Sequence, residues 1–144
     1  MIWERTPYRM TDDPGAVDLD VVHRFLTTSY WSPGIPKDTV ARGIAHSLPF
    51  SVFLKDRQVG FARAVTDRAT FAYLADVFIV EDQRGKGLGV WLVETVLTHP
   101  DLQGLRRWLL ATQDAHALYR KFGFTGIGDA SRLMTRHDPD VYLR

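Results

Sequence analysis

The spacing of apolar residues changes along the chain, and each change predicts a different element. Between residues 17 and 27 the apolar positions recur at intervals of about three to four, which predicts an amphipathic helix; they are Val17, Val21, Val22, Phe25 and Leu26. A second helix is predicted over residues 39–47, with Asp38 as its N-cap. The stretch "SYWSPGIPKD" between them contains two prolines and a glycine, which predicts an irregular loop.

Strand patterns take over in the middle of the chain. The segment "FSVFLKDRQVGFARAVTD" (50–67) predicts two strands joined at "KDRQ", and "TFAYLADVFIV" (70–80) predicts a third, too uniformly apolar to be a solvated edge. Helical spacing resumes over residues 87–98. A short strand, "RRWLLAT" (106–112), and a short helix, "DAHALYRKFG" (114–123), follow.

Weaker strand signals lie at the two ends of the chain. Residues 8–10 predict a strand before the turn "DDPG", and "SRLMT" (131–135) and "DVYL" (140–143) predict one or two more. The order of elements predicts an α+β fold, an α/β/α sandwich around a mixed sheet with one parallel strand–helix–strand unit. The 144 residues fit a single domain spanning 1–144, and 45% hydrophobic residues suffice for a buried core.

Composition removes several classes of function. The formal net charge is +1, from 18 basic and 17 acidic side chains scattered along the chain, so neither a nucleic-acid footprint nor a polybasic membrane anchor is expected. The absence of cysteine excludes disulfides and a thiol nucleophile, and the five histidines lack metal-binding spacing, so no metal is expected. Without a signal peptide or an apolar run of membrane-spanning length, we expect a soluble, cytoplasmic protein.

The segment "QRGKGLG" (83–89) places three glycines between an apolar strand and a helix. Unpaired amides and the positive end of the helix dipole then point to one place, which suits an anion. A Walker loop and a Rossmann loop both fail on glycine spacing, whereas the pattern Arg-x-x-Gly-x-Gly fits Arg84, Gly87 and Gly89. A plain strand-to-helix turn is the alternative.

Two motifs in this order resemble the GNAT superfamily of N-acetyltransferases. Residues 76–97 resemble its acyl-CoA-binding motif, and "DAHALYRKFGF" (114–124) resembles the later motif "A..LYxKxGF". The resemblance implies a mostly antiparallel sheet with a central parallel strand pair splayed around acyl-CoA. It also implies acetyl-CoA as donor, with its pyrophosphate on the loop and its pantetheine arm in a gap between "ADVFIV" and "RRWLLAT". The implied pyrophosphate-binding residues are Gln83, Arg84, Gly85, Lys86, Gly87, Leu88 and Gly89, and the implied pantetheine-binding residues are Val77, Phe78, Ile79 and Thr112. Thr112 stands where the family often has asparagine.

The same resemblance implies a catalytic pair. Tyr119 occupies the position of the tyrosine that protonates the departing CoA thiolate, and its alternative is a buried aromatic residue. Asp76 lies where some members carry a glutamate base, and its alternative is an aspartate at a bulge or strand end. Asp67 is a weaker candidate, more typical of a turn cap.

The acceptor side rests on fewer signals. In this fold the loop between the first two helices covers the acceptor, so Tyr30 and Trp31 are candidate pocket residues, with loop anchoring as the alternative. Arg63 is either a contact for an anionic acceptor group or a surface arginine. No cysteine and no GxSxG motif supplies a nucleophile, so direct transfer from acetyl-CoA to a primary amine is expected. The alternative is a non-catalytic acyl-CoA sensor, and exposed strand edges are compatible with a homodimer.

Overall fold

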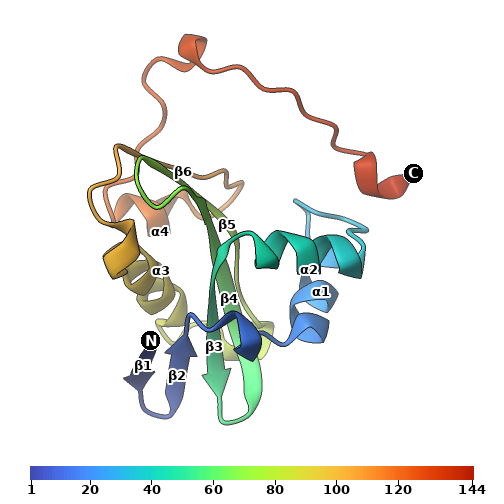
Figure 1. Cartoon of the computed structure of the whole chain (residues 1–144), viewed down its shortest axis with the longest axis vertical. Helices are drawn as coiled ribbons and strands as arrows, with labels where there is room; N and C mark the ends of the chain where they lie inside the picture. The colour runs from blue at the N-terminus through green and yellow to red at the C-terminus, as the bar shows by residue number, and fades with distance from the viewer.

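A six-stranded sheet forms the centre of the molecule, with helices on both faces (Figure 1). The computed structural model describes all 144 residues. The strands lie side by side in chain order, and every neighbouring pair is antiparallel except the last, β5 and β6, which is parallel. The strands are β1 (Ile2–Arg5), β2 (Tyr8–Thr11), β3 (Leu48–Leu54), β4 (Arg57–Thr66), β5 (Phe71–Ile79) and β6 (Arg107–Leu109).

Four α-helices cover the sheet in two layers. They are α1 (Leu19–Thr27), α2 (Lys37–Ala45), α3 (Leu88–Thr98) and α4 (His116–Arg120). One core is formed by β-strand residues with α3 and Tyr119 of α4, and the other by α1 and α2 against Phe61 and Phe78. The predicted α/β/α sandwich around a mixed, mostly antiparallel sheet is confirmed.

Helix α1 begins at a side-chain N-cap, whereas α2 does not. Asp18 accepts a hydrogen bond from the Val21 amide at 3.3 Å and caps α1. Asp38 does not cap α2, contrary to the prediction, because α2 already begins at Lys37 after Pro36 and has no side-chain cap. Pro36 fixes the extended entry into the helix, and Asp38 falls in the first turn, where a negative charge still favours the helix dipole.

Strand β5 contains a β-bulge at its centre. Phe61 pairs with Phe78 and Arg63 with Ala75, so Ala62 alone faces the two residues Asp76 and Val77. Asp76 has φ of 56°, in the left-handed region that few residues other than glycine adopt. The bulge moves Phe78 to the α1/α2 core, although Leu74, four residues earlier, belongs to the core beneath α3.

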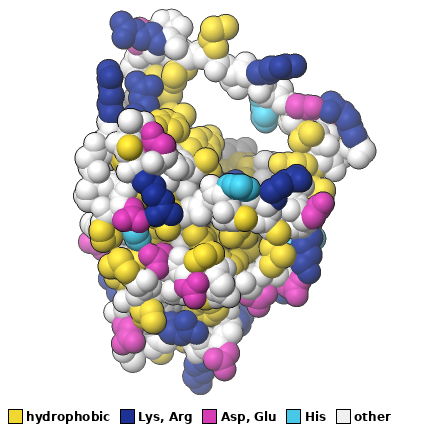
Figure 2. All heavy atoms as spheres, viewed as in Figure 1, with side chains coloured by type: hydrophobic (Ala, Val, Ile, Leu, Met, Phe, Trp, Pro, Cys, Tyr) yellow, Lys and Arg dark blue, Asp and Glu magenta, His cyan; other side chains and the backbone are white.

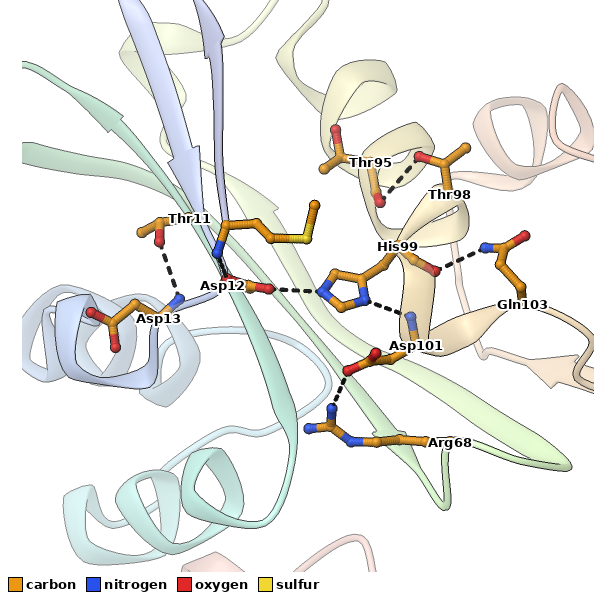
Figure 3. Close-up of polar contacts among 10 residues, drawn as sticks. Thr11, Asp12, Asp13, Arg68, Thr95, Thr98, His99, Asp101 and Gln103 are labelled. Carbon is orange, nitrogen blue, oxygen red and sulfur yellow. Dashed lines mark hydrogen bonds and ion pairs between the residues drawn. The ribbon is translucent and has the colours of Figure 1, made fainter.

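A polar cluster ties the end of β2 to the end of α3 (Figure 3). His99 is 4% exposed, and its Nε2 lies 2.7 Å from a carboxylate oxygen of Asp12, while its Nδ1 accepts from the Asp101 amide at 3.1 Å. The bond to Nδ1 puts the imidazole proton on Nε2, so the ring donates to Asp12. Asp101 in turn pairs with Arg68 at 2.5 Å.

The predicted C-terminal strands do not form. Residues 131–135 and 140–143 contain only short 3₁₀ turns, at Ala130–Arg132 and Val141–Leu143, within an extended segment that leaves the body after α4 (Figure 1). A strand needs a neighbouring strand for its backbone hydrogen bonds, and none lies beside this segment within the chain. The parallel pair β5–β6 therefore lies at one end of the sheet, not at its centre.

Candidate active site

The glycine-rich loop presents a row of free backbone donors at the start of α3. The first hydrogen bond of the helix runs from the Trp91 amide to the Gly87 carbonyl at 3.1 Å, and the six N–H groups of residues 85–90 donate to no acceptor in the protein. Gly85 and Gly87 both have φ of 78°, so the backbone of the turn itself requires glycine there. Free amides at a helix N-terminus bind anions well.

Gly89 supports a ligand site more strongly than Gly85 and Gly87, because its backbone does not require glycine. It lies in the first turn of α3 with ordinary helical backbone, so its conformation does not demand glycine. A Cβ built on Gly89 would meet no atom within 4 Å, which means that its absence is not explained by crowding inside the protein. The missing side chain instead keeps the space in front of the free amides open, as close approach of a phosphate requires.

Gln83 and Arg84 contribute differently from the other predicted loop residues. Their amides are already used, donating to Val80 and Glu81 at 3.0 and 3.2 Å, so the free donors begin at Gly85. The Gln83 side chain is buried and accepts from the Tyr8 hydroxyl at 2.6 Å, and the Arg84 Nε donates to the Ile79 carbonyl at 3.0 Å. Both side chains thus stabilise the loop through hydrogen bonds to neighbouring segments.

Arg5 is a loop neighbour that the sequence reasoning missed. Its guanidinium lies 5.3 Å above the ring of Trp91 in α3, and its Nη1 lies 3.9 Å from where a Cβ on Gly87 would be. It comes from β1, far from the loop in sequence, and no motif signals it. Together with the exposed Lys86, it adds positive charge beside the free amides.

The two parallel strands separate next to the loop. Strands β5 and β6 pair only over three residues, Phe71, Ala72 and Tyr73 on β5, and from Leu74 to Ile79 β5 pairs with β4 alone. The predicted pantetheine residues Val77, Phe78 and Ile79 lie in this part, where the edge of β5 that faces β6 is unpaired. The Phe78 ring is buried and stacks on Phe25 at 4.0 Å, so only its backbone can serve a ligand in the gap.

Tyr119 lies on α4, and its ring belongs to the core beneath α3. It is 8% exposed, and its hydroxyl has no hydrogen-bond partner in the protein. Burial, with smaller contributions from Tyr30 and Asp114, raises the pKa of Tyr119 to about 12. A phenol with this pKa remains protonated at neutral pH and can act only as a proton donor. Thr112 has a different use, since its hydroxyl accepts from the Ala115 amide at 3.0 Å at the start of α4.

Asp76 joins the sheet to the loop between α1 and α2. One carboxylate oxygen accepts from the indole N–H of Trp31 at 2.9 Å, and the other from the Nε of Arg63 at 2.6 Å. Arg63 also donates to Ser47 at 3.0 Å, so it is a half-buried partner of Asp76 and not a plain surface arginine. With both oxygens engaged, the carboxylate is better arranged to position Trp31 than to receive a proton.

Tyr30, the neighbour of Trp31 in the α1–α2 loop, contacts the segment before α4. Its hydroxyl accepts from the Gln113 amide at 3.0 Å, which links the α1–α2 loop to the segment between β6 and α4. Tyr30 and Trp31 are 53% and 39% exposed and meet edge to face at 5.0 Å, so neither is a core residue. The structure therefore links Trp31 to Asp76 and brings Tyr30 near Tyr119, whose pKa it influences, whereas Asp67 caps the β4–β5 turn.

Comparison with known proteins now decides the family. The sequence profile described as the acetyltransferase (GNAT) family matches residues 19–124, which include β5, the glycine-rich loop and α4. The chain belongs to the GNAT family. A crystal structure of a candidate GNAT acetyltransferase from Xanthomonas campestris pv. campestris is 44% identical with a TM-score of 0.93, covering 96% of this chain and 99% of that one.

Two more distant proteins named as acetyltransferases are also similar to this chain. A candidate acetyltransferase of Gibberella zeae is 29% identical over 142 residues, covering 83% of this chain and 79% of its own length. A predicted acetyltransferase of Clostridium acetobutylicum, whose structure was determined with acetyl-CoA, has a TM-score of 0.64 at 13% identity over 90% of this chain and 93% of that one. At that identity the likeness shows the fold alone.

One cavity of this GNAT protein adjoins the gap without including the loop. It has a volume of about 1000 Å³ and lies between β6, α4 and the extended C-terminal segment. Tyr119 and Thr112 line it, but no residue of the 83–89 loop does. No three histidine, aspartate or glutamate side chains come together as a metal-binding group, and no helix has the length and apolar character to span a bilayer.

Proposed function

We propose that the protein transfers an acetyl group from acetyl-CoA directly to a primary amine. The observation that carries this proposal is a set of three features: the free amides at α3, the edge of β5 that has no partner strand beyond Tyr73, and the Tyr119 hydroxyl. The family supplies the chemistry class, and these three features supply a binding surface for each part of the donor.

The loop residues fit the pyrophosphate of the donor. The open space over Gly89 and the free amides of residues 85–90 provide a cradle without side chains, and Arg5 and Lys86 supply charge. A hydrogen bond to a charged group contributes about 1.5–3 kcal/mol, so three or four of them approach the roughly 8 kcal/mol of micromolar binding.

The backbone of β5 fits the rest of the donor. Beyond Tyr73 the strand edge facing β6 is unpaired, and an extended amide-containing arm can pair with it as an added strand would. The bulge at Asp76 and Val77 breaks the regular ladder here, which leaves an amide near Val77 or Phe78 for the carbonyl oxygen that gains charge during transfer.

Tyr119 acts as a hydrogen-bond donor to the leaving sulfur. The amine nitrogen forms the new C–N bond, the C–S bond breaks, and the phenol hydrogen-bonds the sulfur as it becomes a thiolate. The difference between a pKa of about 12 and a thiol near 8.5 makes complete proton transfer uphill by about 5 kcal/mol. Tyr119 therefore stabilises the thiolate by donation, and the proton lost by the amine completes the thiol.

Asp76 acts through Trp31 and not as the direct base. Both carboxylate oxygens already accept hydrogen bonds, one from Trp31 and the other from Arg63, with which Asp76 forms a half-buried ion pair. Removal of the amine proton then falls to water at the open side of the gap. The engagement of Asp76 also favours a second candidate function, a sensor that binds acyl-CoA without turnover, since it leaves the site without a free carboxylate base.

One experiment separates the two candidates. The wild type and Tyr119→Phe are incubated with acetyl-CoA and a panel of primary amines, thiol release is followed, and acetyl-CoA affinity is measured by calorimetry. A transferase releases CoA in an amine-dependent way, and Tyr119→Phe lowers kcat at least about tenfold with unchanged affinity. Binding without amine-dependent release would support the sensor, and a fully active Tyr119→Phe would remove the proposed acid.

A further inference from the structure

Helices α1 and α2 leave part of their face of the sheet uncovered. Alternation along β4 puts Arg63 and Val65 on the same face as Phe61, which packs against the two helices. Val65 belongs to neither hydrophobic core and is 39% exposed, so the helices do not reach over it. The far end of this face therefore stays open to solvent.

Three apolar side chains form one row across the open part of the face. Val65 pairs with Tyr73 of β5, and Tyr73 pairs with Leu109 of β6, so all three point to the same side of the sheet. None of them packs against either core. Phe71, two residues before Tyr73 on the same side of β5, extends the row and is 37% exposed. We refer to these four residues as the apolar patch.

Exposed aromatic residues of the α1–α2 loop lie beside the same face. Trp31 donates to Asp76, whose ion pair with Arg63 lies two residues along β4 from Val65. Outside residues 125–144, four of the seven exposed large hydrophobic side chains belong to this loop or to the patch: Tyr30, Trp31, Val65 and Phe71. Figure 2 shows apolar side chains around the opening between the body and the C-terminal segment. Apolar groups gathered in this way are typical of a binding surface.

The patch ends where the gap between β5 and β6 begins. Tyr73 is the last residue of β5 that pairs with β6, and beyond it the facing strand edge is free. Ala75, the next residue on the same side of β5, lies roughly 7 Å along the strand from Tyr73, in the direction of the amides proposed to bind the reacting carbonyl. An acceptor whose amine reaches that carbonyl therefore places its remaining atoms over the patch.

The charges around the patch do not suit an acceptor with a second cationic group. Asp76 is already paired with Arg63 at the inner end of the patch. Arg107, which pairs with Phe71 in the register of β5 and β6, is exposed and adds positive charge at the outer end. The Asp67 carboxylate accepts hydrogen bonds from the amides and a hydroxyl of its own turn. Neither carboxylate is free to bind a second ammonium group.

We propose that the acceptor is an apolar amine, a molecule with one primary amino group joined by a short chain to an aromatic or branched aliphatic group that lies on the patch. This assignment rests on the proposed function, because it names the acceptor of the same transfer. A polyamine, or a sugar with several amino groups, would bring a second positive charge towards Arg107 and would leave the apolar side chains in contact with polar groups.

Two pairs of amines test the class of acceptor. Phenethylamine and ethylamine differ by the apolar group, and hexylamine and hexamethylenediamine differ by the second cation. With saturating acetyl-CoA, kcat/KM is expected to be at least about tenfold higher for phenethylamine than for ethylamine, and higher for hexylamine than for the diamine. Equal values within the first pair, or a preference for the diamine, would overturn the proposal and leave the proposed acetyl transfer standing.

A charge placed on the patch tests where the acceptor lies. Val65→Asp adds a carboxylate at an exposed position and is expected to lower the ratio of kcat/KM for phenethylamine to that for ethylamine at least about tenfold, and to favour the diamine over hexylamine. Ile2→Asp is the matched control, because Ile2 is also exposed and apolar but lies in β1, at the opposite edge of the sheet. If Val65→Asp changes these ratios no more than Ile2→Asp does, the patch does not contact the acceptor and the proposal is wrong.

A binding measurement separates this proposal from the proposed function. Calorimetric titration of the protein with bound CoA is expected to show phenethylamine binding that Val65→Asp weakens at least about tenfold and Ile2→Asp does not. Binding without acetyl transfer in the presence of acetyl-CoA would remove the function and keep the patch as an amine site. Transfer without a difference between the two variants would keep the function and remove the patch. Neither binding nor transfer would overturn both.

Discussion

Replacement of Gly89 by alanine tests whether the missing side chain serves the protein or a ligand. Glycine within a helix is less favourable than alanine by up to about 1 kcal/mol, and the new Cβ meets no atom within 4 Å. Gly89→Ala is therefore expected to stabilise the fold by about 0.5–1 kcal/mol, which raises the Tm by roughly 2–4 °C.

The same methyl group is expected to weaken donor binding. It projects into the space in front of the free amides, where it would prevent one phosphate contact worth about 1.5–3 kcal/mol. Since about 1.4 kcal/mol corresponds to a tenfold change, the Kd for acetyl-CoA should rise by roughly 10- to 100-fold. Stability and affinity thus move in opposite directions, which a general structural defect would not produce.

The measurement combines thermal melting without ligand with calorimetric titration of acetyl-CoA. Gly43→Ala is the matched control, because Gly43 is also helical and its Cβ would make only ordinary contact, at 3.8 Å, with the Arg63 guanidinium. The control should gain stability without losing affinity. If Gly89→Ala binds acetyl-CoA as tightly as the wild type, the loop does not hold the pyrophosphate in the way described.

Three other changes test separate parts of the structure. Asp76→Asn should lower kcat/KM because it disturbs Trp31, and it should change acetyl-CoA affinity little. A larger loss of kcat that disappears at high pH would instead show that Asp76 is the general base. Arg5→Ala should weaken acetyl-CoA binding several-fold with a reduced salt dependence, whereas Arg9→Ala, which removes a similar stacked arginine over Phe53, should not. Hydrogen bonds from Thr70 and nearby amides hold the pKa of Asp67 well below its unfolded value, so the stabilisation from Asp67 is present above about pH 4 and decreases below it. The Tm difference between wild type and Asp67→Asn should therefore shrink from pH 7 to pH 3. A Tm difference that stays constant over this range would contradict the inference.

The periodicity of the chain predicted the layers of the fold because each helix and inner strand buries its own apolar face. The same reasoning failed for residues 131–135, since a strand also needs a partner for its backbone groups, which short-range pattern does not report. It also placed the start of α2 two residues late, because the helix follows Pro36 without a side-chain cap.

The motifs of the candidate site could be recognised from local sequence. The loop and Tyr119 both lie in such local patterns, and in the structure Leu88 of the loop and Tyr119 belong to the same hydrophobic core. Arg5, Gln113 and Ser47 were missed, because each reaches the site from a distant segment through the folded arrangement. The pairing of Asp76 with Arg63 was missed for the same reason, and it changed the role inferred for the carboxylate.

The bulge at Asp76 also has a consequence for insertions and deletions in β5. Leu74 faces the core beneath α3 and Phe78 faces the opposite core, so the side chains change parity between them. Removing Asp76 would restore strict alternation and leave each apolar residue facing its present core. The fold can therefore dispense with this residue, and its left-handed backbone is a local cost that packing does not require. A shortened β5 should fold, straighten beside β4 and lose the irregularity on which the site is built.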